Sequence, residues 1–261
     1  MKVDRAAGLL LVVTCAGLLS SCDDGDDRRS RGPARTETRD VGSFDAIDMS
    51  GAARLEITVG KPESLTLEGR AASVERVTTE VRHNTLFIES KPRDWFMSNN
   101  RRRITVRINV PKLASLQVEG GNDVRLTGFD GGETVIKASG AAHIFAEGRL
   151  NELTVRMAGA GHGDFSRLEA DQARVTVEGV GSVIVHPKDT LDATMNGVGA
   201  ILYTGSPRQV NTRMNGLGTI AQKNAKDLEE DDEDAIDPED LQPEREEPKK
   251  KPAAGGSTEV I

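Results

Sequence analysis

The chain repeats a short motif about every nineteen residues, and this repeat constrains the fold more than any other feature. The motif alternates apolar and other residues and then reads Gly-x-(Gly, Ala or Asn)-x-apolar. Counted from its first glycine, it occurs at Gly51, Gly120, Gly140, Gly161, Gly179, Gly197 and Gly216. Self-similarity at a period of this length is typical of solenoids.

Alternation within the motif predicts β-strands with one buried face. The apolar residue that ends each motif should stack into an interior ladder of Leu55, Val124, Ile144, Phe165, Val183, Ile201 and Ile220. A coil of about nineteen residues is too short for a strand and a full helix, but it holds two or three short strands. We therefore expect an all-β fold, a right-handed parallel β-helix-like solenoid with coils of about nineteen residues.

Residues 53–118 fit the repeat less well. Five alternating stretches there predict strands joined by hairpins, at 53–60, 64–69, 79–82, 85–90 and 104–110. We expect this strand-rich N-terminal half to cap one end of the solenoid and cover its open strand edge. The solenoid domain as a whole is expected over residues 41–222.

The first 21 residues are typical of an export signal, with Lys2 and Arg5 followed by an apolar stretch over 6–19. Leu19-Ser20-Ser21-Cys22 then resembles the bacterial lipobox, whose cysteine becomes the lipid-bearing N-terminus. We expect Cys22 to carry diacylglycerol and an N-acyl chain such as palmitate, which would bind the membrane. The alternative is an ordinary signal peptide with a chance cysteine. Residues 22–40 are polar and are expected to form a flexible tether.

The end of the sequence differs sharply in composition. Residues 224–261 carry 14 acidic and 5 basic side chains, a net charge of −9 that accounts for nearly all of the chain's −8. Such a composition buries too little apolar surface to fold, so residues 223–261 are expected to form an acidic disordered tail. No basic face is evident, and we expect no nucleic-acid partner.

Two groups of side chains are candidates for binding. The residue before each ladder position places Asp123, His143, Asp164 and Ser182 on one outward line of neighbouring coils. Carboxylates beside an imidazole favour its charged form and could also ligate a divalent metal, and His162 is close in sequence. The alternative is an ordinary solvated face, because outward positions of a strand are polar in most proteins.

The second group surrounds the single tryptophan. Trp95 and Phe96 precede Arg101 and Arg102 in a segment that joins two predicted strands. Aromatic rings beside guanidinium groups could bind a glycan, an anionic lipid or a protein partner. The alternative is that the two rings cover the end of the core. The sequence contains no catalytic motif of the kinds commonly recognised, and we expect no catalytic residue, metal or cofactor.

Taken in order, several elements resemble one bacterial family of unknown function, the auto-transporter adhesin head GIN domain family. They are Phe44-Asp45-Ala46-Ile47 with Ser50-Gly51, Thr85-Leu86-Phe87-Ile88, Val110-Pro111-Lys112-Leu113, the serial Gly-x-Gly motifs and Tyr203-Thr204-Gly205-Ser206-Pro207. The resemblance covers roughly residues 41–222. It implies a β-helical domain on secreted or lipid-anchored envelope proteins, similar in shape to adhesin heads, and it supplies no catalytic residue.

These observations predict a lipid-anchored protein of the bacterial cell envelope whose solenoid binds rather than catalyses. The expected partners are the membrane, through Cys22, and an envelope protein or a glycan. Two alternatives stay open: a polysaccharide-active β-helix enzyme, and an accessory protein of envelope assembly or stress. The membrane, the face of it and the oligomeric state are left open, and only the analogy with adhesin heads suggests a trimer.

Overall fold

The computed structural model describes residues 33–90 and 104–223, and this part of the chain is all-β, as the sequence predicts. Among these residues the single helix has four residues, and no helix is long and apolar enough to cross a membrane. The elements are β1 (Ala34–Arg39), β2 (Ala46–Val59), β3 (Ser64–Arg70), α1 (Ala71–Val74), β4 (Val77–Arg82), β5 (Thr85–Ser90), β6 (Ile104–Val110), β7 (Ser115–Asp130), β8 (Glu133–Val177), β9 (Val180–Met195), β10 (Val198–Tyr203), β11 (Gln209–Met214) and β12 (Leu217–Gln222).

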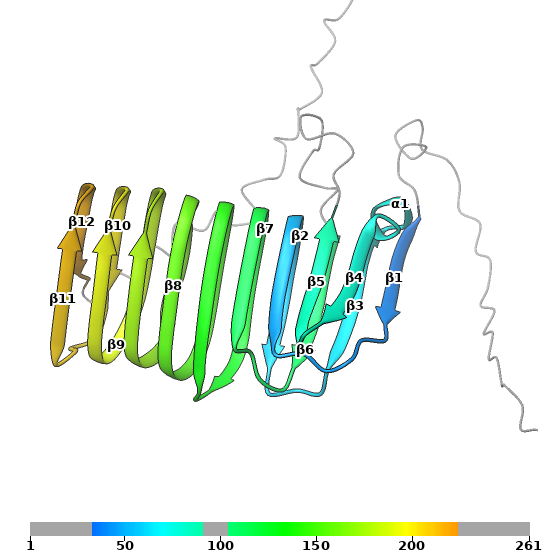
Figure 1. Ribbon diagram of the computed structural model, residues 1–261, viewed down its shortest axis with the longest axis horizontal. Helices are drawn as coiled ribbons and strands as arrows, with labels where there is room; N and C mark the ends of the chain where they lie inside the picture. Colours follow the sequence, from blue (N-terminus) through cyan, green and yellow to red (C-terminus); the bar gives the residue numbers. More distant parts are fainter. Residues whose placement is uncertain (1–32, 91–103, 224–261) are drawn as a thin grey trace, which may run out of the picture.

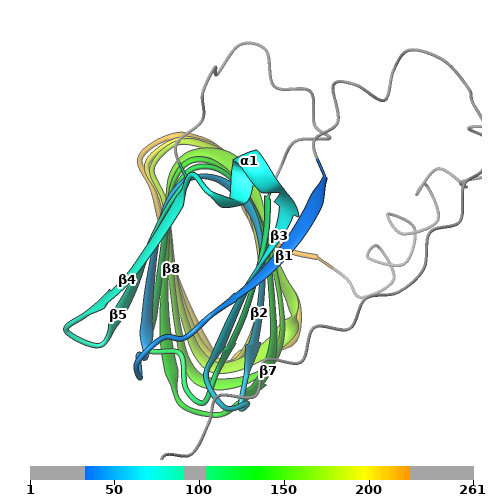
Figure 2. The same cartoon turned by 90° about the vertical axis from the view of Figure 1, so that its right-hand side faces the viewer.

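These strands form one open sheet, in which β2, β7, β8, β9, β10 and β12 follow one another in sequence order (Figure 1). The main path through the sheet is β1-β3-β6-β2-β7-β8-β9-β10-β12, while β11 pairs with β9 and the β4–β5 hairpin pairs with β2 through β5. Viewed along the stack, the long strands bend around a common elongated interior (Figure 2).

Neighbouring repeats pair in parallel with their glycines side by side. Gly51 pairs with Gly120, and Gly120 pairs with Gly140. Gly120 has a φ of +101°, and a Cβ at this position would overlap the carbonyl of Gly51. The repeat therefore requires glycine here for two reasons, a backbone conformation that L-residues avoid and the close approach of the next strand.

The interior ladder forms as predicted over most of its length. Leu55 pairs with Val124, Val124 with Ile144, and Val183 with Ile201, and all five are at most 2% exposed. Ile220 pairs with Ile201 and is partly buried. Since side chains alternate along a strand, each ladder position also places its two sequence neighbours on the outer surface.

The fourth repeat departs from the predicted register. Gly159, and not Gly161, packs between Gly140 and Gly179, while Gly161 pairs with Gly181. Gly163 consequently occupies the ladder level beside Val183, and Phe165 pairs with Val185 instead. A Cβ on Gly163 would lie 2.7 Å from the Phe165 ring, so the ring fills the space that a larger ladder residue would take.

All five stretches predicted as strands between residues 53 and 118 are strands, β2 to β6. The N-terminal half of β2 pairs with β5 and its C-terminal half with β6, both in parallel, while β7 pairs along its other edge. The β4–β5 hairpin turns at His83 and Asn84, both at positive φ. This half thus covers the edge of β2, as expected of a cap.

One predicted boundary needs correction. Residues 22–40 were expected to form a tether, but β1 spans Ala34–Arg39 and pairs antiparallel with β3. The polar composition misled because β1 lies mostly exposed, and hydrogen bonds join it to β4: Arg39 Nη1 donates to the Val77 carbonyl at 2.7 Å and to Thr79 Oγ1 at 3.0 Å. Within β1, Arg39 Nε donates to Glu37 Oε1 at 2.8 Å. The Arg39 hydrogen bond holds the pKa of the Glu37 carboxyl below its ordinary value.

Candidate functional site

The outward residues next to the ladder form a continuous row across β2, β7, β8 and β9, with β8 contributing two residues from successive repeats. We call Arg54, Asp123, His143, His162 and Ser182 the outward row. Arg54 pairs with Asp123, Asp123 with His143, and His162 with Ser182 in the parallel registers. Ala200 and Thr219 continue the row over β10 and β12 with small side chains.

Polar contacts link the row's members along its length. Arg54 Nε donates to Asp123 Oδ2 at 3.2 Å, and both side chains are about half exposed, at 56% and 41%. The His143 and His162 rings lie 5.5 Å apart at an interplanar angle of 44°. His162 Nδ1 lies 2.6 Å from Ser182 Oγ, a hydrogen bond in which either group can donate depending on the imidazole tautomer. The backbone therefore holds two imidazoles side by side at the surface.

The structure places His162 in this row where the sequence analysis expected Asp164. The prediction counted the fourth repeat from Gly161, and the observed register begins two residues earlier. Asp164 instead pairs with Ile184, and its Oδ1 accepts a hydrogen bond from the Ser166 backbone N–H at 2.9 Å. The structure thus brings Asp123, His143 and Ser182 together as predicted, adds His162 and moves Asp164 to another row.

A second outward row contains an aromatic ring that the sequence analysis did not single out. Phe145 pairs with Arg125, whose guanidinium lies 4.6 Å from the ring centroid, and the Arg167 guanidinium lies 5.7 Å from the same ring. A cation within about 6 Å of a ring face is attracted by its quadrupole. Phe145 follows the ladder residue Ile144, and this outward aromatic position was the signal available in the sequence.

The remaining predicted residues, Cys22, Trp95, Phe96, Arg101 and Arg102, lie outside the described residues. Over 33–90 and 104–223, no cluster of three His, Cys, Asp or Glu side chains is arranged to bind a metal ion. In the outward row, Asp123 is paired with Arg54.

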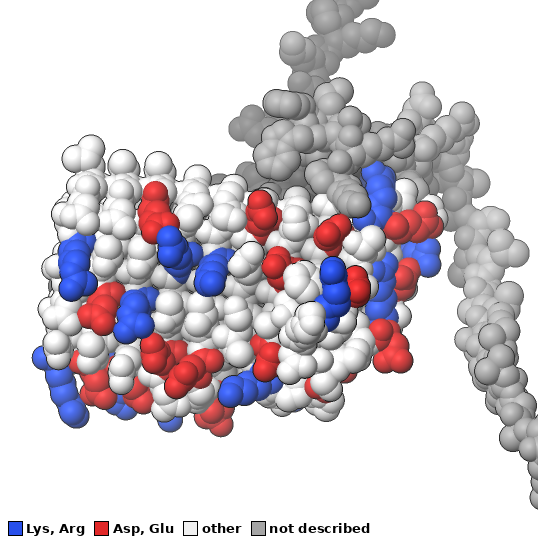
Figure 3. All heavy atoms as spheres, viewed as in Figure 1, with Lys and Arg blue, Asp and Glu red and all other residues white. Residues whose placement is uncertain are grey.

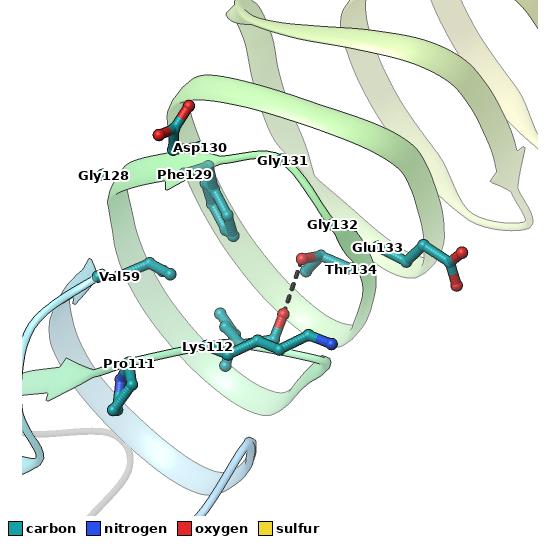
Figure 4. A pocket seen from close by; sticks show the side chains of 12 residues that line it. Val59, Pro111, Lys112, Gly128, Phe129, Asp130, Gly131, Gly132, Glu133 and Thr134 are labelled. Carbon is teal, nitrogen blue, oxygen red and sulfur yellow. Dashed lines mark hydrogen bonds between the residues drawn. The ribbon is translucent and has the colours of Figure 1, made fainter.

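A shallow pocket of about 310 Å³ lies where the ends of β2, β6 and β7 meet the start of β8. Its lining includes Val59, Leu113 and Phe129, and the Thr134 hydroxyl donates to the Leu113 carbonyl at 2.8 Å (Figure 4). The carboxylates of Asp130 and Glu133 point away from this pocket and away from each other. Their arrangement therefore does not resemble a pair of carboxylates facing one substrate.

Charge on the exterior is mixed. Lysine and arginine alternate with aspartate and glutamate over the face shown in Figure 3, without a large area of one sign. Many of these charges pair across neighbouring strands: Arg156 Nη2 lies 2.8 Å from Glu178 Oε1, and Arg174 lies between Glu152 and Asp192 at 3.4 and 3.9 Å. Such exposed pairs contribute little to stability, but they leave a surface of fixed polar groups.

The family model described as "Putative auto-transporter adhesin, head GIN domain" matches residues 43–207, which is most of the described chain. The match begins before the first glycine motif and ends with the Tyr203-Thr204-Gly205-Ser206-Pro207 segment. The chain belongs to this GIN domain family. No curated protein sequence matches the chain.

Two solved structures are similar to this chain to different degrees. A "putative adhesin" from Bacteroides fragilis is 23% identical, with a TM-score of 0.59 over 73% of this chain and 97% of that one. A "putative adhesin" from Parabacteroides distasonis is 19% identical, with a TM-score of 0.44 over 74% and 98% of the two chains. The similarity to the Bacteroides fragilis structure shows a common fold.

Proposed function

We propose that this GIN domain is an adhesin-like binding protein of the bacterial cell envelope and that its outward row is part of the binding surface. The observation that carries the proposal is the row itself, in which the parallel register holds Asp123, His143, His162 and Ser182 in one line. A rigid sheet that holds polar groups in fixed positions costs little entropy when it binds. Membership of a family described by adhesin heads supports the same role.

The proposed architecture is a right-handed parallel β-helix solenoid with coils of about nineteen residues. Parallel pairing of successive repeats supports it, since parallel strands need a crossover and crossovers are right-handed in nearly all proteins. Solenoids present long, regular faces suited to extended partners.

The chemistry of the face favours a glycan or an envelope protein as the partner. Imidazole, hydroxyl and carboxylate groups can donate to and accept from sugar hydroxyls or a polar peptide surface. Phe145, with two guanidinium groups over it, adds an apolar ring that a sugar or peptide can contact.

The described residues give less support to the alternative of a polysaccharide-active enzyme. Asp123 is paired with Arg54, Asp164 lies in a different row, and the pocket's two carboxylates diverge. General acid–base cleavage of a glycoside needs two carboxyl groups on opposite sides of one bond.

We further propose that Cys22 is lipidated, that residues 1–21 are removed as a signal and that a short polar segment from Cys22 to β1 links the lipid to the domain. Residues 223–261 would then extend from the opposite end of the stack as an acidic tail.

Location in the cell tests this proposal. Membranes are separated from soluble protein, and intact cells are treated with protease, for the wild type, Cys22→Ala and the matched control Cys15→Ala. We expect the wild type and Cys15→Ala to be membrane-bound and cleaved on intact cells, and Cys22→Ala to leave the membrane fraction. Membrane-bound protein protected from protease would contradict adhesion at the cell surface. Cys22→Ala protein retained in the membrane would contradict the lipid anchor.

A further inference from the structure

The last strands of the sheet leave apolar side chains exposed. Among residues 33–90 and 104–223, the exposed large apolar side chains are Val180 (61%), Val198 (48%), Val210 (39%), Met214 (45%) and Leu217 (73%). All of them lie at or after the start of β9. Val180, Val198 and Leu217 pair with one another in register and form an outward ridge, whereas Val210 and Met214 lie on β11.

Val210 and Met214 face the interior of the stack. They pair with Leu191 and Met195 on β9, both fully buried, and so continue two interior columns by one further level. The sheet path gives β11 no partner on its other side among the described residues. An unpaired strand with exposed interior side chains is an edge that proteins usually cover.

The charge of this edge indicates what can cover it. Residues 193–223 contain Arg208, Arg213 and Lys223 and no acidic residue. Arg208 pairs with Asp189 at 3.4 Å, whereas Arg213, on the outward face of β11, has no ion pair with the described residues. Two copies meeting edge to edge would bring like charges together, which disfavours a second copy and favours an acidic strand.

The chain itself carries such a segment beyond β12. Residues 224–261 have a net charge of −9, and most of them are charged or proline-interrupted. Residues 257–261, Ser-Thr-Glu-Val-Ile, differ because they lack proline and include three strong strand formers. A flexible chain of the length of residues 224–256 would have a root-mean-square span of at least roughly 30 Å, enough to reach back across the end of the stack.

We propose that residues 257–261 add to the open edge as a strand beside β11, with Glu259 opposite Arg213. In this register Thr258 and Val260 lie on the same face as Thr212 and Met214 and extend the interior columns. The central pair is the same whether the added strand runs parallel or antiparallel to β11. Since the segment is tethered, its effective concentration at the edge is in the millimolar range, and a modest intrinsic affinity suffices.

Hydrogen exchange of the full chain in detergent tests the proposal, with the amides of β11 as the readout and those of β7 as the internal folding control. The informative variant is Val260→Asp, and its matched control is Ala253→Asp, which adds the same charge outside the proposed strand. We expect β11 exchange to quicken at least 10-fold in Val260→Asp, with β7 unchanged, and to stay at the wild-type rate in Ala253→Asp.

A charge exchange tests the pairing itself. Arg213→Glu and Glu259→Arg should each quicken β11 exchange about 2–5-fold, and the double variant should restore protection, because a cross-strand ion pair of either polarity is equivalent. Equal rates of β11 amide exchange in Val260→Asp and Ala253→Asp would overturn the proposal. So would β11 protection that rises with protein concentration together with a dimeric mass, which would assign the edge to a second copy.

Discussion

His162 Nδ1 lies 2.6 Å from Ser182 Oγ, and this contact reflects the register in which the fourth repeat pairs with the fifth. In a chain lacking both native cysteines, His162→Cys with Ser182→Cys should form a disulfide on mild oxidation. Paired residues on adjacent strands lie about 4.8 Å apart, within the range that a disulfide spans. Mass spectrometry of the oxidised peptide measures the yield.

The control for this pair is Asp164→Cys with Ser182→Cys, two residues out of register. It should remain reduced under the same conditions, since Asp164 pairs with Ile184. Efficient cross-linking of the Asp164 pair, with none for the His162 pair, would contradict the register described above and return Asp164 to the outward row.

The stacked glycines of successive repeats predict that alanine destabilises the domain much more at position 120 than at position 121. Gly120→Ala should destabilise the domain by about 2 kcal/mol or more, because the residue has a positive φ and its Cβ would overlap the Gly51 carbonyl. Gly121→Ala, whose Cβ would meet only the Ala52 Cβ at 3.9 Å, should change stability by about 1 kcal/mol or less. Urea denaturation measures both, and equal losses would contradict the close approach of the strands.

Phe165 predicts a cavity effect at the irregular fourth repeat. Phe165→Ala should cost about 3–5 kcal/mol of unfolding free energy, because the ring is fully buried and also fills the space above Gly163. Phe145→Ala removes the same side chain from the outward face and should cost much less. Chemical denaturation compares the two, and a similar small loss in both would show that the Phe165 ring is not buried.

Asp48 predicts a dependence of stability on pH. Burial, together with the neighbouring Glu119 carboxylate, raises the pKa of Asp48 above its ordinary value of 3.8. The folded state therefore binds the proton more tightly than the unfolded state. Stability falls as the pH rises from the ordinary pKa of the unfolded chain through the raised pKa of the folded state. Asp48→Asn should then melt at a higher temperature than the wild type at pH 7, and the advantage should shrink toward pH 3.

Asp130→Asn is the matched control for Asp48→Asn, because it removes the same charge from an exposed position. Its melting temperature should differ little from that of the wild type at pH 7. An equal rise in both variants would point to net charge rather than to the burial of Asp48.

Most of the fold could be predicted because the repeat encodes it twice, once in glycine spacing and once in strand alternation. The ladder from Leu55 to Val124 to Ile144 follows from these two signals alone. The fourth repeat could not be placed from the sequence because Gly159, Gly161 and Gly163 stand two residues apart, so the Gly-x-Gly motif can begin at Gly159 or at Gly161. In the structure the Phe165 ring packs beside Gly163, a feature of packing that the local motif does not show.

The candidate site could be predicted where the repeats are regular and not where the fourth repeat departs from them. Asp123, His143 and Ser182 fall on one row because their repeats are regular, whereas His162 was hidden by the misplaced glycine. The strand β1 was missed for a different reason. Its residues Arg35, Glu37 and Arg39 are those of a solvated tether. The contacts that join β1 to the domain, its pairing with β3 and the Arg39 hydrogen bonds to Val77 and Thr79 of β4, form only in the folded protein.

The measurement that tests the central claim most directly is binding by the outward row. The chain with Cys22→Ala, coupled to beads, is presented to an array of bacterial and host glycans and to intact cells of the producing bacterium. We predict saturable binding to at least one of these probes that falls 10-fold or more when His143 and His162 are both changed to Ala. The matched variant Arg156→Ala, which lies in a different outward row, should bind like the wild type. Absence of saturable binding to every probe, or binding that the two histidine changes leave intact, would contradict the assignment of this face as the adhesin-like surface.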